Sequence, residues 1–194
     1  MFLILVFGAV ACYILGMAGL MAAAYIFLAV SLAPAVIAAG HLNTIAVHLF
    51  ILYWVMLAVI TPPVAIAVFA AAAIGGTDPF KTGLHAMRLA LILYFIPFFF
   101  VYNPALVFQT NWFESAYLFA LALVGIIFIT GGLEGYLWGF GNLKSWIRPF
   151  LIIGGLLIVF PEIYTTIAGA VMIIFAVIIL KKQRKVSMAD QQAA

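Results

Sequence analysis

Charged residues are scarce in this 194-residue chain: Asp, Glu, Lys and Arg make up 7% of it, whereas 69% of the residues are hydrophobic. Soluble globular domains carry far more charge, and several uncharged runs here exceed the ~20 residues that cross a bilayer. The sequence therefore predicts an all-α, polytopic integral membrane protein. Its net charge of +3 comes from a few clusters, which bears on membrane orientation and not on nucleic-acid binding.

The sequence also lacks the motifs of common catalytic and cofactor sites. Its single cysteine, Cys12, cannot form an internal disulfide, and there is no P-loop, dinucleotide loop or CxxC pair. The histidines share no metal-ligand spacing, and the glutamates fall on separate predicted elements: His41, His48, His85, Glu114, Glu134 and Glu162. We therefore expect no enzyme, no cofactor and no metal cluster.

No basic residue precedes Lys81, so the N-terminal segment lacks the basic region of a secretory signal. We interpret this segment as structure and not as a cleaved leader. The apolar run begins directly after Met1, which indicates that the chain is a piece of something longer.

Residues 2–39 carry no charge and are interrupted by Gly16-Met17-Ala18-Gly19. At 1.5 Å per residue the first leg, residues 2–15, reaches only ~21 Å, short of a ~30 Å hydrocarbon core. These lengths predict a re-entrant helical hairpin with a glycine tip, and Pro34 predicts a kink or an end in the second leg. A single long tilted span is the alternative.

The next run, residues 45–74, is broken by Thr61-Pro62-Pro63. Two prolines remove two backbone N–H donors, and the residue before a proline avoids the helical region, so we predict a break at Ile60-Thr61. A helix broken at membrane depth leaves carbonyls that can hold ions. The alternative is a plain proline kink filled by neighbouring helices.

Beyond the break, Asp78 is predicted as the N-cap of a helix with Pro79 at its first position. Residues 89–108 are predicted as one further span, completing a first domain of residues 1–110. An additional membrane segment, residues 111–180, and a polar, disordered tail, residues 181–194, follow.

In the additional segment we predict a span over residues 116–137. Gly131, Gly135 and Gly139 fall at four-residue spacing near its end, which predicts a smooth face for helix contact. Residues 150–180 are broken at Pro161-Glu162 and read as two short helices that dip into the membrane and return, with a single long span as the alternative. This reading puts the basic clusters at 81–88, 144–148 and 181–185 all in the cytoplasm.

Three strings in this order carry a family resemblance: LGMAGLMAAAY (residues 15–25), HLFILYWVMLAVITPPVAIAVFAAAAIGGTDPFKTG (residues 48–83) and PFFFVYNPAL (residues 97–106). Together they resemble the large permease of the tripartite ATP-independent periplasmic (TRAP) transporters, and most closely the C-terminal part of the fused type, in which small and large membrane subunits share one chain. The resemblance is strong over residues 10–110 and looser over residues 115–180.

The resemblance implies an elevator-type secondary transporter of the bacterial inner membrane, with a cytoplasmic C-terminus. It would take up organic acids from a periplasmic substrate-binding protein, driven by a sodium gradient. Binding would involve the hairpin tip and the helix break, with backbone carbonyls near Gly16 and Ile60 and the Thr61 hydroxyl as sodium ligands. By position, these two elements comprise Gly16, Met17, Ala18, Gly19, Ile60, Thr61, Pro62, Pro63 and Val64.

Two features depart from the family pattern. Met21 and Ala22 stand where family members commonly have threonines, and only one of the two inverted repeats is present. The other repeat, on another part of the permease or a partner subunit, would be needed to complete the site. A non-transporting membrane scaffold or permease remnant is therefore the alternative.

Overall fold

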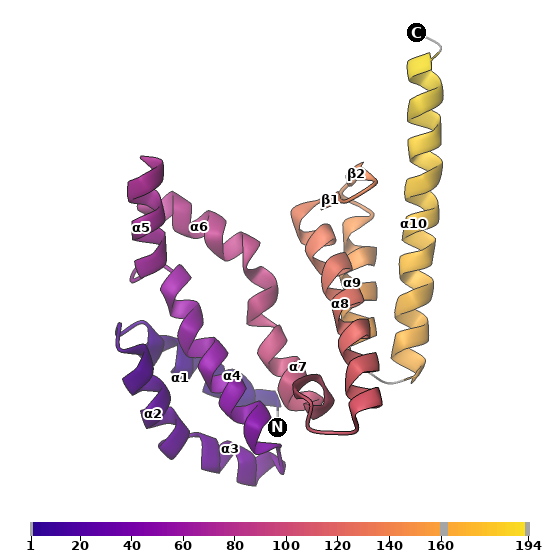
Figure 1. Cartoon of the computed structure of the whole chain (residues 1–194). Helices are drawn as coiled ribbons and strands as arrows, with labels where there is room; N and C mark the ends of the chain where they lie inside the picture. Colours follow the sequence, from indigo (N-terminus) through magenta and orange to yellow (C-terminus); the bar gives the residue numbers. More distant parts are fainter. Residues whose placement is uncertain (1, 160–162, 193–194) are drawn as a thin grey trace. The chain divides into compact units, whose positions relative to one another are not determined.

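The computed structural model describes residues 2–159 and 163–192, and contacts divide the chain into unit 1, residues 1–110, and unit 2, residues 111–194 (Figure 1). Unit 1 is made of α-helices and short 3-10 helices (η). In order these are α1 (Phe2–Gly16), α2 (Met21–Ser31), α3 (Ala33–Gly40), α4 (Thr44–Leu57), η1 (Ala58–Ile60), α5 (Ile66–Gly75), α6 (Pro79–Leu89), η2 (Leu91–Tyr94), α7 (Ile96–Tyr102) and η3 (Pro104–Val107).

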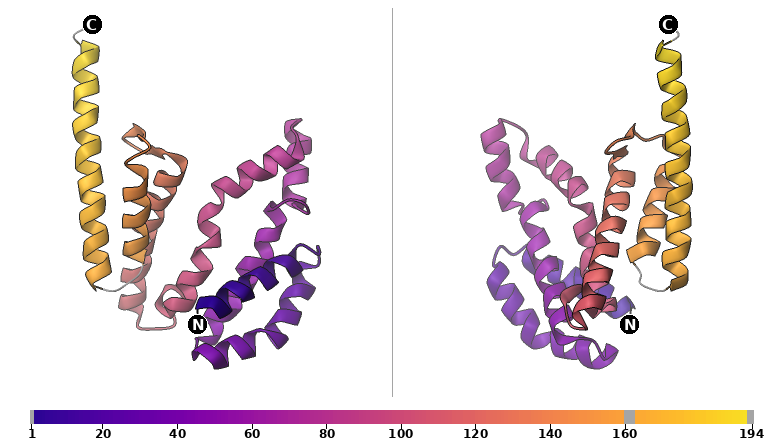
Figure 2. Two further views of the ribbon diagram at one scale, coloured as in Figure 1. Left: turned by 180° about the vertical axis from the view of Figure 1, so that it is seen from behind. Right: turned by 45° about the vertical axis from the view of Figure 1, so that its right-hand side comes forward.

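The predicted hairpin is present in unit 1 (Figure 2). Its first leg is α1, its tip is the turn over residues 17–20, and its second leg is α2 followed by α3, bent by 43° at Leu32. Pro34 lies in the first turn of α3, where its missing N–H costs nothing, so the predicted kink is confirmed.

The core of unit 1 forms where α4 packs against both legs of the hairpin. The side chains of Leu5, Cys12, Val47 and Phe50 are all buried in this cluster. Hydrophobic burial therefore fixes the hairpin on α4 and holds the tip near the C-terminal end of that helix.

The predicted helix break is confirmed. Helix α4 ends at Leu57, η1 continues to Ile60, and Thr61 is extended with φ −106° and ψ 124°. Helix α5 begins only at Ile66, after Ala65 in the left-handed region with φ 33°.

The N-cap of α6 is also confirmed: Asp78 Oδ1 accepts a hydrogen bond of 2.8 Å from Lys81 N, and Pro79 opens the helix. In the region predicted as a span over residues 89–108, η2, α7 and η3 follow one another, and the segment Leu91–Tyr102 meets α6 at an angle of 67°. Pro97 lies in the first turn of α7 and Pro104 opens η3, because the fixed φ of proline suits a first turn and not an interior.

Unit 2 contains α8 (Trp112–Glu134), a small antiparallel hairpin of β1 (Tyr136–Leu137) and β2 (Gly141–Asn142), α9 (Arg148–Val159) and α10 (Ile163–Gln192). Helices α9 and α10 pack side by side, so the single long span over residues 150–180 is wrong. The break at Pro161-Glu162 lies outside the described residues. Because α10 continues to Gln192, the second helix is not short, and the prediction of a disordered tail is wrong up to that residue.

The predicted contact face of Gly131, Gly135 and Gly139 is wrong. Helix α8 ends at Glu134, and Gly135 and Gly139 have positive φ in the turns that follow. Other glycines make the close contacts: a Cβ at Gly155 would lie 2.7 Å from the carbonyl oxygen of Gly125, so α8 and α9 meet backbone to backbone there. Four-residue spacing does not give a contact face where a left-handed glycine ends the helix.

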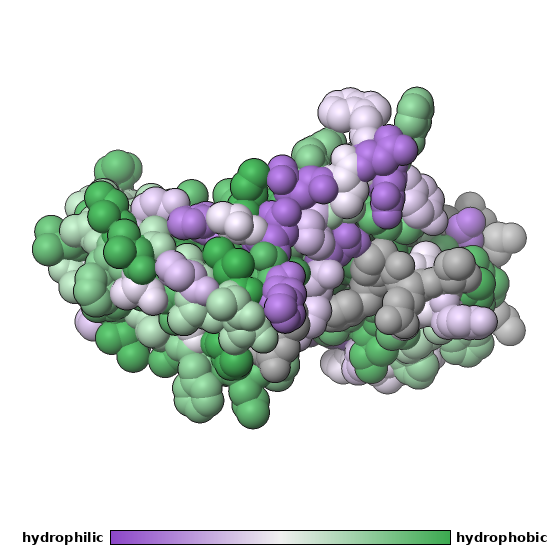
Figure 3. Space-filling view, turned by 90° about the horizontal axis from the view of Figure 1, so that it is seen from below, coloured by the Kyte–Doolittle hydropathy of each residue, from purple (hydrophilic) through white to green (hydrophobic). Residues whose placement is uncertain are grey.

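Much of the molecular surface is apolar (Figure 3). Phe7, Ile74 and Phe113 are each more than two-thirds exposed, as expected of side chains that face lipid. Among the described residues, Trp112–Glu134 and Tyr164–Lys181 are each long and apolar enough to cross a membrane, and two bent helix pairs raise the number of candidate spans to four. The chain is an all-α, polytopic membrane protein, as predicted.

Candidate functional site

The hairpin reaches α4 just before the helix break. A Cβ at Gly16, the last residue of α1, would lie 2.5 Å from the carbonyl oxygen of Val55 and 3.1 Å from the Cβ of Ala58. Only a glycine allows this approach, which brings the end of the first leg to within one helical turn of Thr61. The tip itself extends beyond the contact, since a Cβ at Gly19 would meet nothing within 4 Å.

Thr61 is the buried polar residue of the break, with 3% of its surface exposed. Its hydroxyl donates to the carbonyl oxygen of Leu57 at 2.7 Å and is 2.9 Å from the hydroxyl of Tyr94. The first bond satisfies the Leu57 carbonyl, which lies at the C-terminal end of α4, where carbonyls lack helical partners. The second bond joins the helix break to η2, because Tyr94 lies 33 residues further along the chain. Thr61 Oγ1 keeps lone-pair capacity for a further partner.

Tyr94 of η2 also belongs to an aromatic cluster with Tyr13 from α1 and Trp54 from α4. Their ring centroids lie 5.7 to 6.4 Å apart in edge-on arrangements. The indole Nε1 of Trp54 is buried without a hydrogen-bond partner among the described residues. Sequence reasoning missed this cluster, and the available signal was the presence of hydroxyl and indole groups in otherwise apolar runs.

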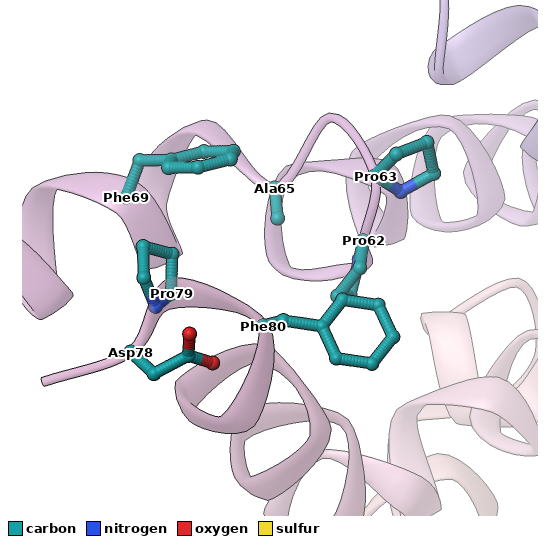
Figure 4. Close-up of a pocket in the computed structure, with 7 residues that line it drawn as sticks. All are labelled: Pro62, Pro63, Ala65, Phe69, Asp78, Pro79 and Phe80. Atoms are coloured by element: carbon teal, nitrogen blue, oxygen red, sulfur yellow. The ribbon is translucent and has the colours of Figure 1, made fainter.

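A cavity of about 380 Å³ lies on the other side of the break. Figure 4 shows Pro62, Pro63 and Ala65 on one side of it and Asp78, Pro79 and Phe80, from the start of α6, on the other; Phe69 of α5 is the remaining lining residue. Its walls are mainly apolar, and the Asp78 carboxylate is the charged group in its lining.

Helix α6 is also tied to the break, because a Cβ at Gly83 would lie 2.5 Å from Cγ of Pro62. The proline ring therefore rests on the glycine, with Val68 of α5 beside it. The string Gly75-Gly76-Thr77-Asp78-Pro79 thus turns the chain so that α6 packs back onto the prolines.

The chemistry available around Thr61 is that of neutral oxygen atoms. Residues 1–110 contain three charged side chains, Asp78, Lys81 and Arg88, and the hydrogen-bonded groups around Thr61 are hydroxyls and carbonyls. The described residues contain no group of three or more His, Cys, Asp or Glu side chains that could hold a metal ion. Hydroxyl and carbonyl oxygens suit a hard cation such as sodium.

The predicted site residues therefore come together only in part. Gly16 touches α4 next to Ile60 and Thr61, but its carbonyl oxygen already accepts from Gly19 N at 3.2 Å. Pro62 and Pro63 line the cavity beside α5 and α6, and Val64 lies in the turn that follows. Met17 and Ala18 lie in the turn at the tip.

A family model described as "Tripartite ATP-independent periplasmic transporter, DctM component" matches residues 1–115, more than half of the chain. The chain belongs to the DctM family. No curated protein and no solved structure matches it. The matched region contains the hairpin, the broken helix and the α5–α6 turn, so the family resemblance noted from the sequence is confirmed.

Membership makes the chain a permease component of a TRAP transporter, a class of membrane proteins that transport and are not known as enzymes. In general terms, such a component works with other permease parts and with a periplasmic binding protein. Nearly all of unit 2, from residue 116, lies outside the match.

Proposed function

We propose that unit 1 forms one half of the ion- and substrate-binding site of a secondary transporter that takes up organic acids, driven by a sodium gradient. The observation that carries the proposal is the junction of Gly16 with the end of α4, one turn before the buried hydroxyl of Thr61. It places a helix end and a helix break side by side, which is the arrangement that binds ions in broken-helix transporters.

In this proposal the sodium ion binds at the break. The Gly16 carbonyl oxygen, which keeps a second lone pair beside its bond to Gly19 N, the Ile60 carbonyl oxygen and the Thr61 hydroxyl oxygen supply ligands. Further oxygens come from the rest of the permease or from water. The Thr61 proton is directed to Leu57, so the Tyr94 hydroxyl donates to Thr61 Oγ1, and one lone pair of this oxygen is left for a cation. Pro63 supports the role of the break, because it removes the amide that a continuous helix would offer to the carbonyl of Val59.

A carboxylate substrate fits the charge of this region. A sodium ion bound among neutral groups adds a positive charge in a medium of low dielectric, where it attracts an anion strongly. The binding of ion and carboxylate is then mutually favourable, which is the thermodynamic basis of symport.

The missing parts of the site come from partners. The second inverted repeat closes the site from the other side, and a periplasmic binding protein delivers the acid. With the chain in the bacterial inner membrane, the hairpin enters from the periplasm and the basic residues 81–88 and the C-terminus face the cytoplasm. Because the hairpin and broken helix share one core, they move together in an elevator step.

The proposal is tested by reconstituting the complete permease with its binding protein in liposomes and measuring uptake of a panel of labelled organic acids under an inward sodium gradient. We expect uptake that requires sodium and collapses when the gradient is dissipated. A proton gradient alone sustaining full uptake would contradict the choice of ion. Absence of uptake of any organic acid would favour the scaffold alternative.

A further inference from the structure

The fold of unit 2 brings two basic clusters that are far apart in sequence to one end. Leu143 and Ile147, which both precede α9, pack with Leu180 of α10 in one buried cluster. Lys144, Arg148 and Lys181 each follow one of these residues directly, so they lie at the same end of the unit. The side chains of Lys144 and Lys181 are exposed, and that of Arg148 is half-buried.

Positive charge is concentrated here. Lys182, Arg184 and Lys185 follow on the same helix, α10. The basic end of unit 2, defined as Lys144, Arg148 and Lys181, is followed in the sequence by Lys182, Arg184 and Lys185, so it and the sequence after it contain six of the eight Lys and Arg residues of the chain. Glu134 lines the adjoining groove and Asp190 follows in the sequence, so the excess charge of these segments is positive.

Arg148 has the geometry of an anion ligand. Its guanidinium lies directly over Gly135, where any side chain would collide with it, and its Nε is buried without a hydrogen-bond partner among the described residues. A buried donor left without an acceptor is costly. A phosphate oxygen would satisfy it, since the guanidinium fork matches phosphate oxygens in pairs.

An apolar groove of about 700 Å³ adjoins the basic end. Leu137 belongs both to the lining of the groove and to the buried cluster with Leu143 and Leu180. The remaining lining is mainly apolar and includes Ile127 and Phe128 of α8 and Val177 of α10, with Glu134 as the charged group. A groove of this kind suits a hydrocarbon chain and not a soluble anion.

This end also lies at membrane–water level. It contains the C-terminal ends of both candidate spans in unit 2, Trp112–Glu134 and Tyr164–Lys181. Trp138 is 92% exposed and Trp146 is 49% exposed, as in the aromatic belts at membrane interfaces. The anion within reach at this level is a phospholipid headgroup.

We propose that the basic end of unit 2 and the adjoining groove form a binding site for an anionic phospholipid, with the phosphate on Arg148 and Lys144 and one acyl chain along the groove. Clusters of basic residues next to a span attract anionic lipids, each contributing several-fold in affinity. The site lies outside the part of the chain that the family model matches.

The test uses the purified full chain in neutral detergent micelles, titrated with short-chain phosphatidylglycerol or with phosphatidylcholine of the same chain length. Native mass spectrometry counts the bound lipids. We expect phosphatidylglycerol to bind saturably and at least about tenfold more tightly than phosphatidylcholine. Equal binding of the two lipids would overturn the proposal, and so would displacement of phosphatidylglycerol by millimolar inorganic phosphate, which would indicate a free-anion site.

Matched variants locate the site. Lys144→Gln with Arg148→Gln should weaken phosphatidylglycerol binding at least about fivefold, whereas Lys81→Gln, an exposed charge in unit 1, should leave it unchanged. Arg148→Lys keeps the positive charge but lacks the guanidinium fork, so its affinity for phosphatidylglycerol should lie between those of the unchanged protein and the double variant. If the Arg148 variants do not fold, Lys181→Gln with Lys182→Gln tests the same end on α10. Unchanged binding in whichever pair folds would contradict the assignment.

Discussion

Gly83 of α6 lies directly under the ring of Pro62, so close that a Cβ would be 2.5 Å from the proline Cγ. The two residues are 21 positions apart, and their contact fixes the angle at which the chain returns after the helix break. Both belong to the part of the chain that matches the DctM family.

Gly83→Ala should therefore destabilise unit 1. In a free helix this change is favourable, but here the new methyl group overlaps a rigid ring, which costs about 1–3 kcal/mol. Thermal unfolding in detergent, followed by tryptophan fluorescence, measures the effect. Gly8→Ala is the control, because its Cβ would make ordinary contacts at 3.6 and 3.9 Å. Equal unfolding temperatures of the Gly83→Ala and Gly8→Ala variants would contradict the packing of α6 on the prolines.

Tyr94→Phe should loosen the break without enlarging any cavity. It removes the hydroxyl 2.9 Å from Thr61 Oγ1 and should lower the free energy of unfolding by about 0.5–1.5 kcal/mol. Tyr53→Phe is the control, since Tyr53 packs edge-on against Phe100 and its hydroxyl makes no hydrogen bond to the described residues. If Tyr53→Phe lowered the free energy of unfolding more than Tyr94→Phe, the Thr61–Tyr94 hydrogen bond would not contribute to stability.

Asp78→Ala should weaken the start of α6. The carboxylate accepts from Lys81 N, and loss of such a cap costs about 1 kcal/mol. Asp78→Asn keeps an accepting oxygen and should retain most of the stability. Chemical denaturation monitored by circular dichroism distinguishes them; a variant pair with the same midpoint as the unchanged protein would show that the cap contributes nothing.

Gly155→Ala should separate α8 from α9. The added Cβ would meet the carbonyl oxygen of Gly125 at 2.7 Å, and backbone atoms cannot move aside cheaply, so a loss of about 1–3 kcal/mol is expected. Gly139→Asn serves as the comparison: Gly139 has φ 86° and nothing within 4 Å of a Cβ, and Asn tolerates that conformation better than most residues. If Gly139→Asn lowered the unfolding temperature more than Gly155→Ala, the close contact of α8 and α9 at Gly125 and Gly155 would be contradicted.

Features with a local chemical cause were predictable from the sequence. The break at Thr61 follows from the missing donors of Pro62 and Pro63, and the cap at Asp78 follows from its place before Pro79. Both are present in the structure. The hairpin was predictable because a glycine pair divided an uncharged run into legs of unequal length.

Features that depend on tertiary packing were not predictable. Tyr94 reaches Thr61 only because the chain bends after α6, and no local pattern specifies that angle. Gly135 and Gly139 have the spacing of a contact face, but the helix ends before them. The continuation of α10 past Lys181 was missed because a polar composition was taken to mean a disordered segment.

The most direct test of the account is the sodium dependence of uptake by the complete permease carrying Thr61→Ala, with Thr61→Ser as the matched control. If the Thr61 hydroxyl is a sodium ligand, Thr61→Ala should raise the sodium concentration for half-maximal uptake by roughly tenfold or more, and Thr61→Ser should restore most of it. An unchanged half-maximal concentration in a folded Thr61→Ala permease would contradict the proposal that this junction binds the coupling ion.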